Sequence, residues 1–173
     1  PLGEGGAALI GLKWPNDLWL TGAGDPGRKL GGVLIETLPV GDRRMCIVGI
    51  GLNVLPQQFE DLSSGYACWQ EIDPHTTAPS VLAAVAEPLV RALRRFEREG
   101  FAAFAAAYSQ RDLLRGRTIT TTQPGVPEGV ADGIDASGAM RVRVDGVVHA
   151  LVAGEVSVRP VGAEKFGTKV EVK

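Results

Sequence analysis

Short apolar runs separated by turn formers dominate the first third of the chain. Residues 8–12 and 18–21 are two such runs on either side of a Pro-Asn-Asp turn. Residues 33–37 and 45–50 are rich in β-branched side chains and predict strands. Because these runs are apolar throughout rather than alternating, we expect them to be buried on both faces. Residues 22–27, rich in Gly, Asp and Pro, predict a loop.

A helical period follows an irregular polar stretch at residues 55–79. Ser80 can cap a helix whose apolar stripe falls at helical spacing: Leu82, Val85, Leu89, Leu93 and Phe96. Pro88 lies inside this stripe, and since an interior proline costs about 3 kcal/mol, a kink or break is expected there. Gly100 then separates a second helix, on which one face carries Phe101, Phe104, Ala105 and Tyr108.

From Arg117 the pattern changes to a period of two. Strands are predicted at 118–122, 129–134, 139–144, 147–152 and 155–159, with Asp145-Gly146 as a hairpin turn. Several short strands within about 45 residues are typical of a small β-barrel. The chain is therefore predicted to be α/β (α+β), with a first domain at 1–115, a barrel at 116–160 and a tail at 161–173.

Composition narrows the class of protein. The 173 residues suffice for one domain plus a small module, and 45% hydrophobic with 22% charged residues is a globular composition. A net charge of −2 gives no broad basic field, which argues against a nucleic-acid partner. No apolar run approaches the roughly 20 residues that span a bilayer. Cys46 and Cys68 favour a reduced cytoplasmic setting, and Cys46, inside an apolar run, is expected to be buried.

Candidate chemistry gathers around two lysines near the N-terminus. Lys29 opens an apolar strand, where a cation is unusual unless an anion lies beside it; the alternative is an exposed lysine at a strand end. Asn16 and Asp17 can close an Asx turn after Pro15. From the residues alone, Lys13 is expected to be a surface lysine. His75 and His149 are isolated in the sequence, and no ligand spacing typical of zinc is found.

Glycines and one asparagine suggest a ligand close to the backbone. Gly31, Gly32 and Gly51 permit close approach because they lack a Cβ, although a β-bulge would explain them equally. A buried Asn53 must be hydrogen-bonded, so it contacts a ligand or ties strand ends together. Trp14 either packs in the core or contacts a ligand.

Three motifs in order resemble the biotin protein ligases. They are Lys13-Trp14-Pro15-Asn16-Asp17, the lysine strand at residues 28–36 (Arg-Lys-Leu-Gly-Gly-Val-Leu-Ile-Glu), and residues 49–54 (Gly-Ile-Gly-Leu-Asn-Val). The C-terminal segment, with Gly154-Glu155 and Arg159, is similar to that family's last domain. The resemblance implies a catalytic core like that of class II aminoacyl-tRNA synthetases, followed by an SH3-like barrel.

The resemblance also implies a reaction and its participants. Biotin and ATP would form biotinyl-5'-AMP, and a lysine of the biotin carboxyl carrier protein of acetyl-CoA carboxylase would then accept the biotin. Lys29 would be the catalytic residue, and Asp17 would bind Mg²⁺. The substrate contacts would be Lys13, Trp14, Asn16, Asp17, Gly31, Gly32, Val33, Gly51, Asn53 and Arg159. Tyr66 or Trp69 would either stack on adenine or anchor a loop.

One departure from the family pattern limits the expected activity. The family's Gly-Arg-rich loop, which precedes the Trp-Pro-Asn-Asp turn, has no counterpart here, and the chain begins without Met, so we expect a missing N-terminal part and impaired activity of the chain alone. Two alternatives stay open. One is a lipoate or octanoyl ligase of the same superfamily, and the other is a non-catalytic fragment that forms a homodimer.

Overall fold

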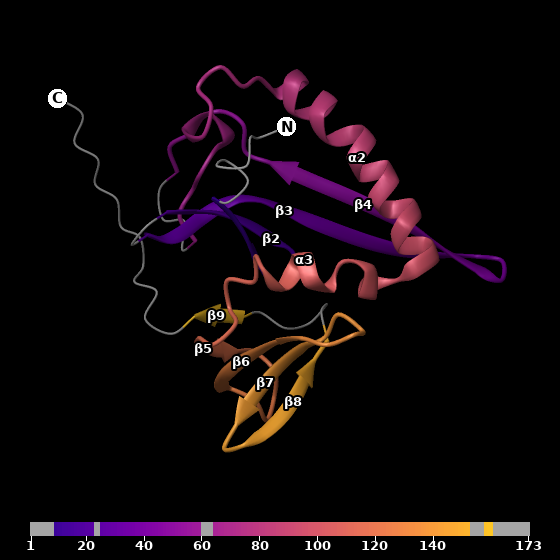
Figure 1. Ribbon diagram of the computed structural model, residues 1–173, viewed down its shortest axis with the longest axis vertical. Coiled ribbons are helices and arrows are strands. Elements are labelled where there is room, and N and C mark those ends of the chain that lie inside the picture. Colours follow the sequence, from indigo (N-terminus) through magenta and orange to yellow (C-terminus); the bar gives the residue numbers. More distant parts are fainter. Residues whose placement is uncertain (1–8, 23–24, 60–63, 153–157, 161–173) are drawn as a thin grey trace.

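A computed structural model describes residues 9–22, 25–59, 64–152 and 158–160 of the chain. Two antiparallel sheets and one long helix form a mixed α+β fold. Figure 1 shows the first sheet and the long helix in the upper part of the view, and the second sheet in the lower part.

The first sheet has the strand order β1-β2-β3-β4. Its strands are β1 (Ile10–Lys13), β2 (Asp17–Gly22), β3 (Asp25–Val40) and β4 (Arg43–Leu52). The predicted loop at 22–27 is therefore wrong in part, because β3 already begins at Asp25. The predicted run at 33–37 is only the middle of this 16-residue strand.

The outer half of the β3–β4 hairpin is exposed on both faces. Leu34 and Ile35, which point to opposite faces, are 62% and 61% exposed, and Met45 and Ile47 are also exposed. The prediction of burial on both faces is wrong for this segment, as is the prediction of a buried Cys46, which is exposed. An apolar run predicts a strand with apolar side chains on both faces. It does not show whether the described part of the chain packs against those faces.

The long helix α2 (Ala78–Glu99) begins two residues before Ser80, so the prediction of Ser80 as the cap is wrong. Thr77 is the N-cap and Ser80 completes a capping box: the Ser80 amide donates to Thr77 Oγ1 and the Thr77 amide donates to Ser80 Oγ. The helix continues through Pro88 and ends at Gly100, whose φ of 65° suits a glycine. Its apolar stripe is largely uncovered, since Leu82 is 69% exposed.

Short helical segments flank this helix along the chain. They are η1 (Trp69–Glu71) before it, and η2 (Phe101–Ala103) and α3 (Ala105–Ser109) after it. Gly100 separates α2 from the aromatic segment, as the sequence predicted.

The second sheet has the order β8-β7-β6-β5-β9. Its strands are β5 (Thr118–Thr121), β6 (Glu128–Ile134), β7 (Met140–Val144), β8 (Val147–Leu151) and β9 (Val158–Pro160). The predicted hairpin at Asp145-Gly146 is confirmed, since both residues have positive φ and Val144 pairs with Val147. The alternation on β7 is confirmed too, with Met140 and Val142 buried and the arginines exposed.

One tryptophan links the two sheets. Trp14, in the turn after β1, is 3% exposed and belongs to the core cluster of the second sheet, together with Leu114, Ile119 and Met140. Its indole N–H donates to the carbonyl of Gly138 at 3.1 Å. Contacts between Trp14 and the second sheet therefore fix the turn that leads to Asn16 and Asp17.

Candidate functional site

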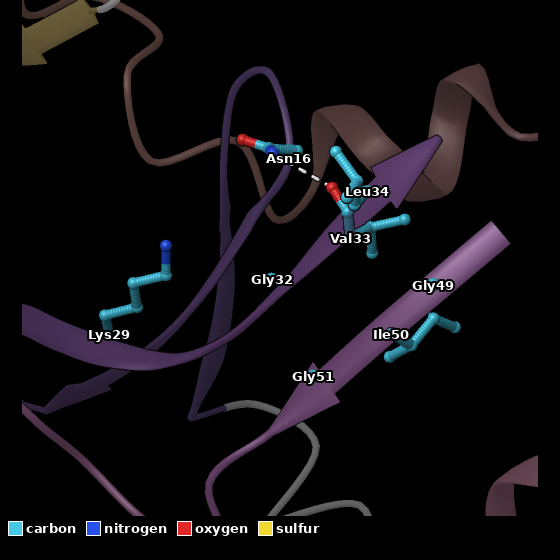
Figure 2. Close-up of a pocket in the computed structure, with 8 residues that line it drawn as sticks. All are labelled: Asn16, Lys29, Gly32, Val33, Leu34, Gly49, Ile50 and Gly51. Atoms are coloured by element: carbon cyan, nitrogen blue, oxygen red, sulfur yellow. Dashed lines mark hydrogen bonds between the residues drawn. The ribbon is translucent and has the colours of Figure 1, made fainter. Parts of the chain in front are cut away.

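A cavity of about 450 Å³ opens over β3 and β4. Figure 2 shows its lining on these two adjacent strands, with Asn16 reaching it from the turn before β2. The lining residues are Asn16, Lys29, Gly32, Val33, Leu34, Gly49, Ile50 and Gly51. Five of these eight were candidates from the sequence; Leu34, Gly49 and Ile50 were not, although they lie within the same two motifs.

Strand register explains why the candidate side chains meet. Lys13 is paired with Asp17, and Asp17 is paired with Gly32, so these three positions share one face of the sheet. A β-bulge follows: Leu18 pairs with Gly31 and Trp19 with Lys29. The extra residue, Leu30, is fully buried in a small core with Leu20 and Ala67, whereas Lys29 faces the cavity.

The charged centre of the site is one carboxylate between two ammonium groups. Lys29 Nζ lies 2.7 Å from Asp17 Oδ1, and Lys13 Nζ lies 3.8 Å from Asp17 Oδ2. The Lys29 side chain is 40% exposed, whereas those of Asp17 and Lys13 are each 15% exposed. Lys13 Nζ also lies 5.6 Å from the centre of the Trp19 ring. Two of these three groups are cationic, and the most exposed of the three is Lys29, which suits contact with an anionic ligand.

The three candidate glycines have different roles. A Cβ on Gly31 would lie 2.4 Å from the carbonyl oxygen of Gly51, so Gly31 is required by strand packing at the bulge. A Cβ on Gly51 would have no atom within 4 Å, so this position leaves room in the cavity. At Gly32 a Cβ would lie 3.4 Å from Asp17 Oδ1, beside the ion pair.

Asn53 ties three backbone segments together. Its side-chain amide donates to the carbonyls of Lys29 at 3.1 Å and Ala67 at 3.0 Å, and its backbone amide donates to Leu30. Both side-chain donors thus hold backbone carbonyls in place, and a contact between Asn53 and a ligand stays a prediction.

Sequence reasoning missed an ion pair that braces the same region. Arg28 Nη2 donates to Glu71 Oε2 at 2.6 Å, and Arg28 Nη1 donates to Glu71 Oε1 and to the Tyr66 carbonyl. Burial by itself would raise the pKa of Glu71, but hydrogen bonds from Arg28 and the Cys68 amide outweigh it and lower that pKa. The pair holds residues 64–71 against β3 beside Lys29, where Lys29 and Tyr66 form a parallel bridge.

The two loop aromatics anchor chain segments. Tyr66 donates its hydroxyl hydrogen to the Leu55 carbonyl at 2.7 Å and packs against Phe59, with ring centres 5.0 Å apart. Trp69 packs against the small core of Leu20, Leu30 and Ala67. These contacts match the anchoring role that the sequence allowed for both residues.

Other candidates lie away from the cavity or outside the description. Trp14 is in the core of the second sheet, as described above. The backbone of Arg159, in β9, pairs with Thr120 of β5. The side chain of Arg159 lies outside the described part of the chain, as do Gly154 and Glu155.

Among residues 9–22, 25–59, 64–152 and 158–160, no group of three or more His, Cys, Asp or Glu is placed to hold a metal ion. The carboxylate of Asp17, the predicted Mg²⁺ ligand, contacts the ammonium groups of Lys29 and Lys13 in this structure. Within the same ranges, no helix has the length and apolar character needed to cross a bilayer.

Comparison with known proteins identifies relatives in sequence. Residues 3–53 match the model of the biotin/lipoate A/B protein ligase family. The chain is 32% identical to the bifunctional ligase/repressor BirA of Escherichia coli over 165 residues, which are 92% of this chain and 49% of that protein. It is 29% identical to the biotin–[acetyl-CoA-carboxylase] ligase of Paracoccus denitrificans, over 88% of this chain and 64% of that protein. The chain thus spans about half the length of the Escherichia coli relative.

Comparison with solved structures supports the fold. The biotin protein ligase of Aquifex aeolicus, solved in complex with biotin and ATP, superposes with a TM-score of 0.71 and 24% identity. The match covers 87% of this chain and 62% of that protein.

Proposed function

Because the chain belongs to the biotin protein ligase family, we propose that its cavity takes part in ATP-dependent biotinylation. In the proposed reaction a biotin carboxylate oxygen attacks the α-phosphorus of ATP, and pyrophosphate leaves. The amine of a carrier-protein lysine then attacks the carbonyl of biotinyl-5'-AMP, and AMP leaves as the amide forms. The proposed acceptor is the biotin carboxyl carrier protein of acetyl-CoA carboxylase.

The observation that carries this proposal is the position of Lys29. Its ammonium group lies on the wall of the cavity, where it contacts Asp17, whose carboxylate also lies near the ammonium group of Lys13. Such a group stabilises the negative charge that develops on phosphate oxygens as pyrophosphate leaves. The acceptor lysine is the nucleophile, so the enzyme requires none of its own, and its contribution is positioning and charge neutralisation.

The remaining lining suits a flat, partly apolar substrate. Val33 and Ile50 provide apolar contacts, and the adjacent Gly32 and Gly51 leave backbone accessible. We propose that this part of the cavity holds the biotin side of the adenylate, while Lys29 and Lys13 face its phosphate. Magnesium would then accompany the ATP phosphates rather than occupy a site made by this chain.

The proposal extends to fold and location. The first sheet would belong to a catalytic core like that of class II aminoacyl-tRNA synthetases, within residues 1–115, and the second to an SH3-like barrel within 116–160. A cytoplasmic location is proposed as well, because ATP is available there and the exposed Cys46 thiol would stay reduced.

Two alternatives each rest on an observation. The matched family model includes lipoate ligases, so lipoate or octanoate is the competing acyl substrate. The exposed apolar side chains of the β3–β4 hairpin and α2 favour self-association, which light scattering would detect as a dimer.

The test is ATP–pyrophosphate exchange with this chain, in which biotin, lipoate and octanoate are each supplied in turn. We expect exchange that depends on biotin, at a rate below that of the Escherichia coli relative used as positive control. If exchange depends on lipoate or octanoate instead, that acid is the substrate and the biotin proposal is wrong. Absence of exchange with all three acids would leave the chain without adenylation activity of its own.

A further inference from the structure

We propose that Asp17 is a positioning residue that holds the Lys29 ammonium in place and releases it to the anionic ligand. The inference rests on the proposed function for the identity of that anion, a phosphate oxygen. It replaces the Mg²⁺-binding role that the sequence suggested for Asp17. In the structure both oxygens of this carboxylate face lysines rather than a set of oxygen ligands.

The backbone around Asp17 is held firmly. The Val33 amide donates to the Asn16 carbonyl at 2.8 Å, and the Asn16 side-chain amide donates to the Val33 carbonyl at 2.9 Å. Figure 2 shows this second bond between the turn and β3. Trp14, three residues before Asp17, is fixed in the core of the second sheet. Asp17 therefore presents its carboxylate from a fixed point.

The carboxylate limits where Lys29 can go. A lysine side chain has many rotamers, and a 2.7 Å contact with a fixed carboxylate selects those that keep Nζ at the cavity wall. Gly32 lies directly against the pair, since a Cβ there would be 3.6 Å from Lys29 Cε and 3.4 Å from Asp17 Oδ1. Absence of a side chain at this position leaves the pair open to the cavity.

The same carboxylate also lowers the attraction of the site for anions. Removal of Asp17 takes one negative charge away from beside the two ammonium groups. A phosphate that binds Lys29 must compete with Asp17, so the ion pair is exchanged when the ligand arrives and re-forms when it leaves. Removal of the carboxylate should therefore strengthen simple anion binding but leave Lys29 less well placed for catalysis.

The experiment is calorimetric titration of the full chain with inorganic pyrophosphate in the absence of Mg²⁺. For Asp17→Asn we expect affinity at least about threefold higher than wild type, because one unit charge acting on each negative charge of the ligand at roughly 6 Å in a water-like medium has about this effect. Asp42→Asn is the matched control, because it removes the same charge from the exposed β3–β4 turn, and we expect it to leave affinity unchanged. In a Lys29→Ala background the effect of Asp17→Asn on pyrophosphate affinity should shrink, because the carboxylate and the anion can no longer compete for Lys29.

Several results would overturn the inference. Unchanged or weaker pyrophosphate binding by Asp17→Asn would show that the carboxylate does not compete with the anion, and absence of binding by every variant would show that the lysines hold none. The binding assay does not require ligase activity, so its outcome can be distinguished from a failure of the proposed function.

Where wild type shows exchange activity, a second readout separates positioning from metal binding. In Asp17→Asn the maximal exchange rate should fall by at least tenfold while the KM for ATP does not rise. A metal ligand would instead give a variant whose activity is recovered at high Mg²⁺, and that result would contradict the positioning role.

Discussion

Gly31→Ala tests whether this glycine is required by strand packing. The added Cβ would lie 2.4 Å from the Gly51 carbonyl oxygen and 2.9 Å from Leu52 Cδ2. The first contact is with backbone of the paired strand, which cannot rotate away, so β3 and β4 must move apart by close to 1 Å at the point where Gly31 pairs with Leu52. Overpacking of this kind costs about 1–3 kcal/mol, and we expect the upper part of that range.

The measurement is urea unfolding followed by circular dichroism, with Gly51→Ala as the matched control. Gly51 lies on the paired strand, but a Cβ there would meet nothing within 4 Å. Its replacement should change the free energy of unfolding by less than about 1 kcal/mol, because alanine reduces the freedom of the unfolded chain. For Gly31→Ala a loss of about 2–3 kcal/mol corresponds to a fall in Tm of roughly 4–12 °C at this chain length. Equal stability of the two variants would refute the packing argument.

Further substitutions test the remaining parts of the account. Lys29→Ala should abolish biotin-dependent exchange without a change in the circular dichroism spectrum, and wild-type turnover would remove Lys29 from the mechanism. Glu71→Gln should destabilise the protein at pH 7. Because the folded-state pKa of Glu71 is lowered, its contribution is present above the ordinary glutamate pKa and lost as pH falls through the folded value. The gap between wild type and Glu71→Gln, measured by urea unfolding, should therefore narrow at pH 3.5; a constant gap would contradict the Arg28 contact. Trp14→Phe should cost about 1–2 kcal/mol by the same assay, since it removes the bond to Gly138 from a buried site, and an unchanged midpoint would show that the bond contributes little.

Local signals in the sequence predicted local structure well. Gly100 ends α2 and Asp145-Gly146 forms a hairpin because a positive φ is required at these positions, and such a requirement is visible in one or two residues. Five lining residues of the cavity were also identified in advance, because they fall in motifs that bring β2, β3 and β4 together.

Non-local features were missed or misjudged for a common reason. The Arg28–Glu71 pair joins residues 43 positions apart, and no local pattern marks it. Trp14 packs with a sheet that begins about 100 residues later, so flanking sequence could not place it. Burial of Leu34 and Ile35 was predicted from apolar character, which does not reveal what covers a strand.

The central claim is that the cavity beside Lys29 binds the adenylate. The most direct test is an NMR titration of ¹⁵N-labelled chain with a non-hydrolysable analogue of biotinyl-5'-AMP. The account predicts saturable shifts of the backbone amides of Lys29, Gly32, Val33, Ile50 and Gly51, and a weaker affinity in Lys29→Ala. Absence of binding, or shifts confined to residues outside the cavity, would contradict it.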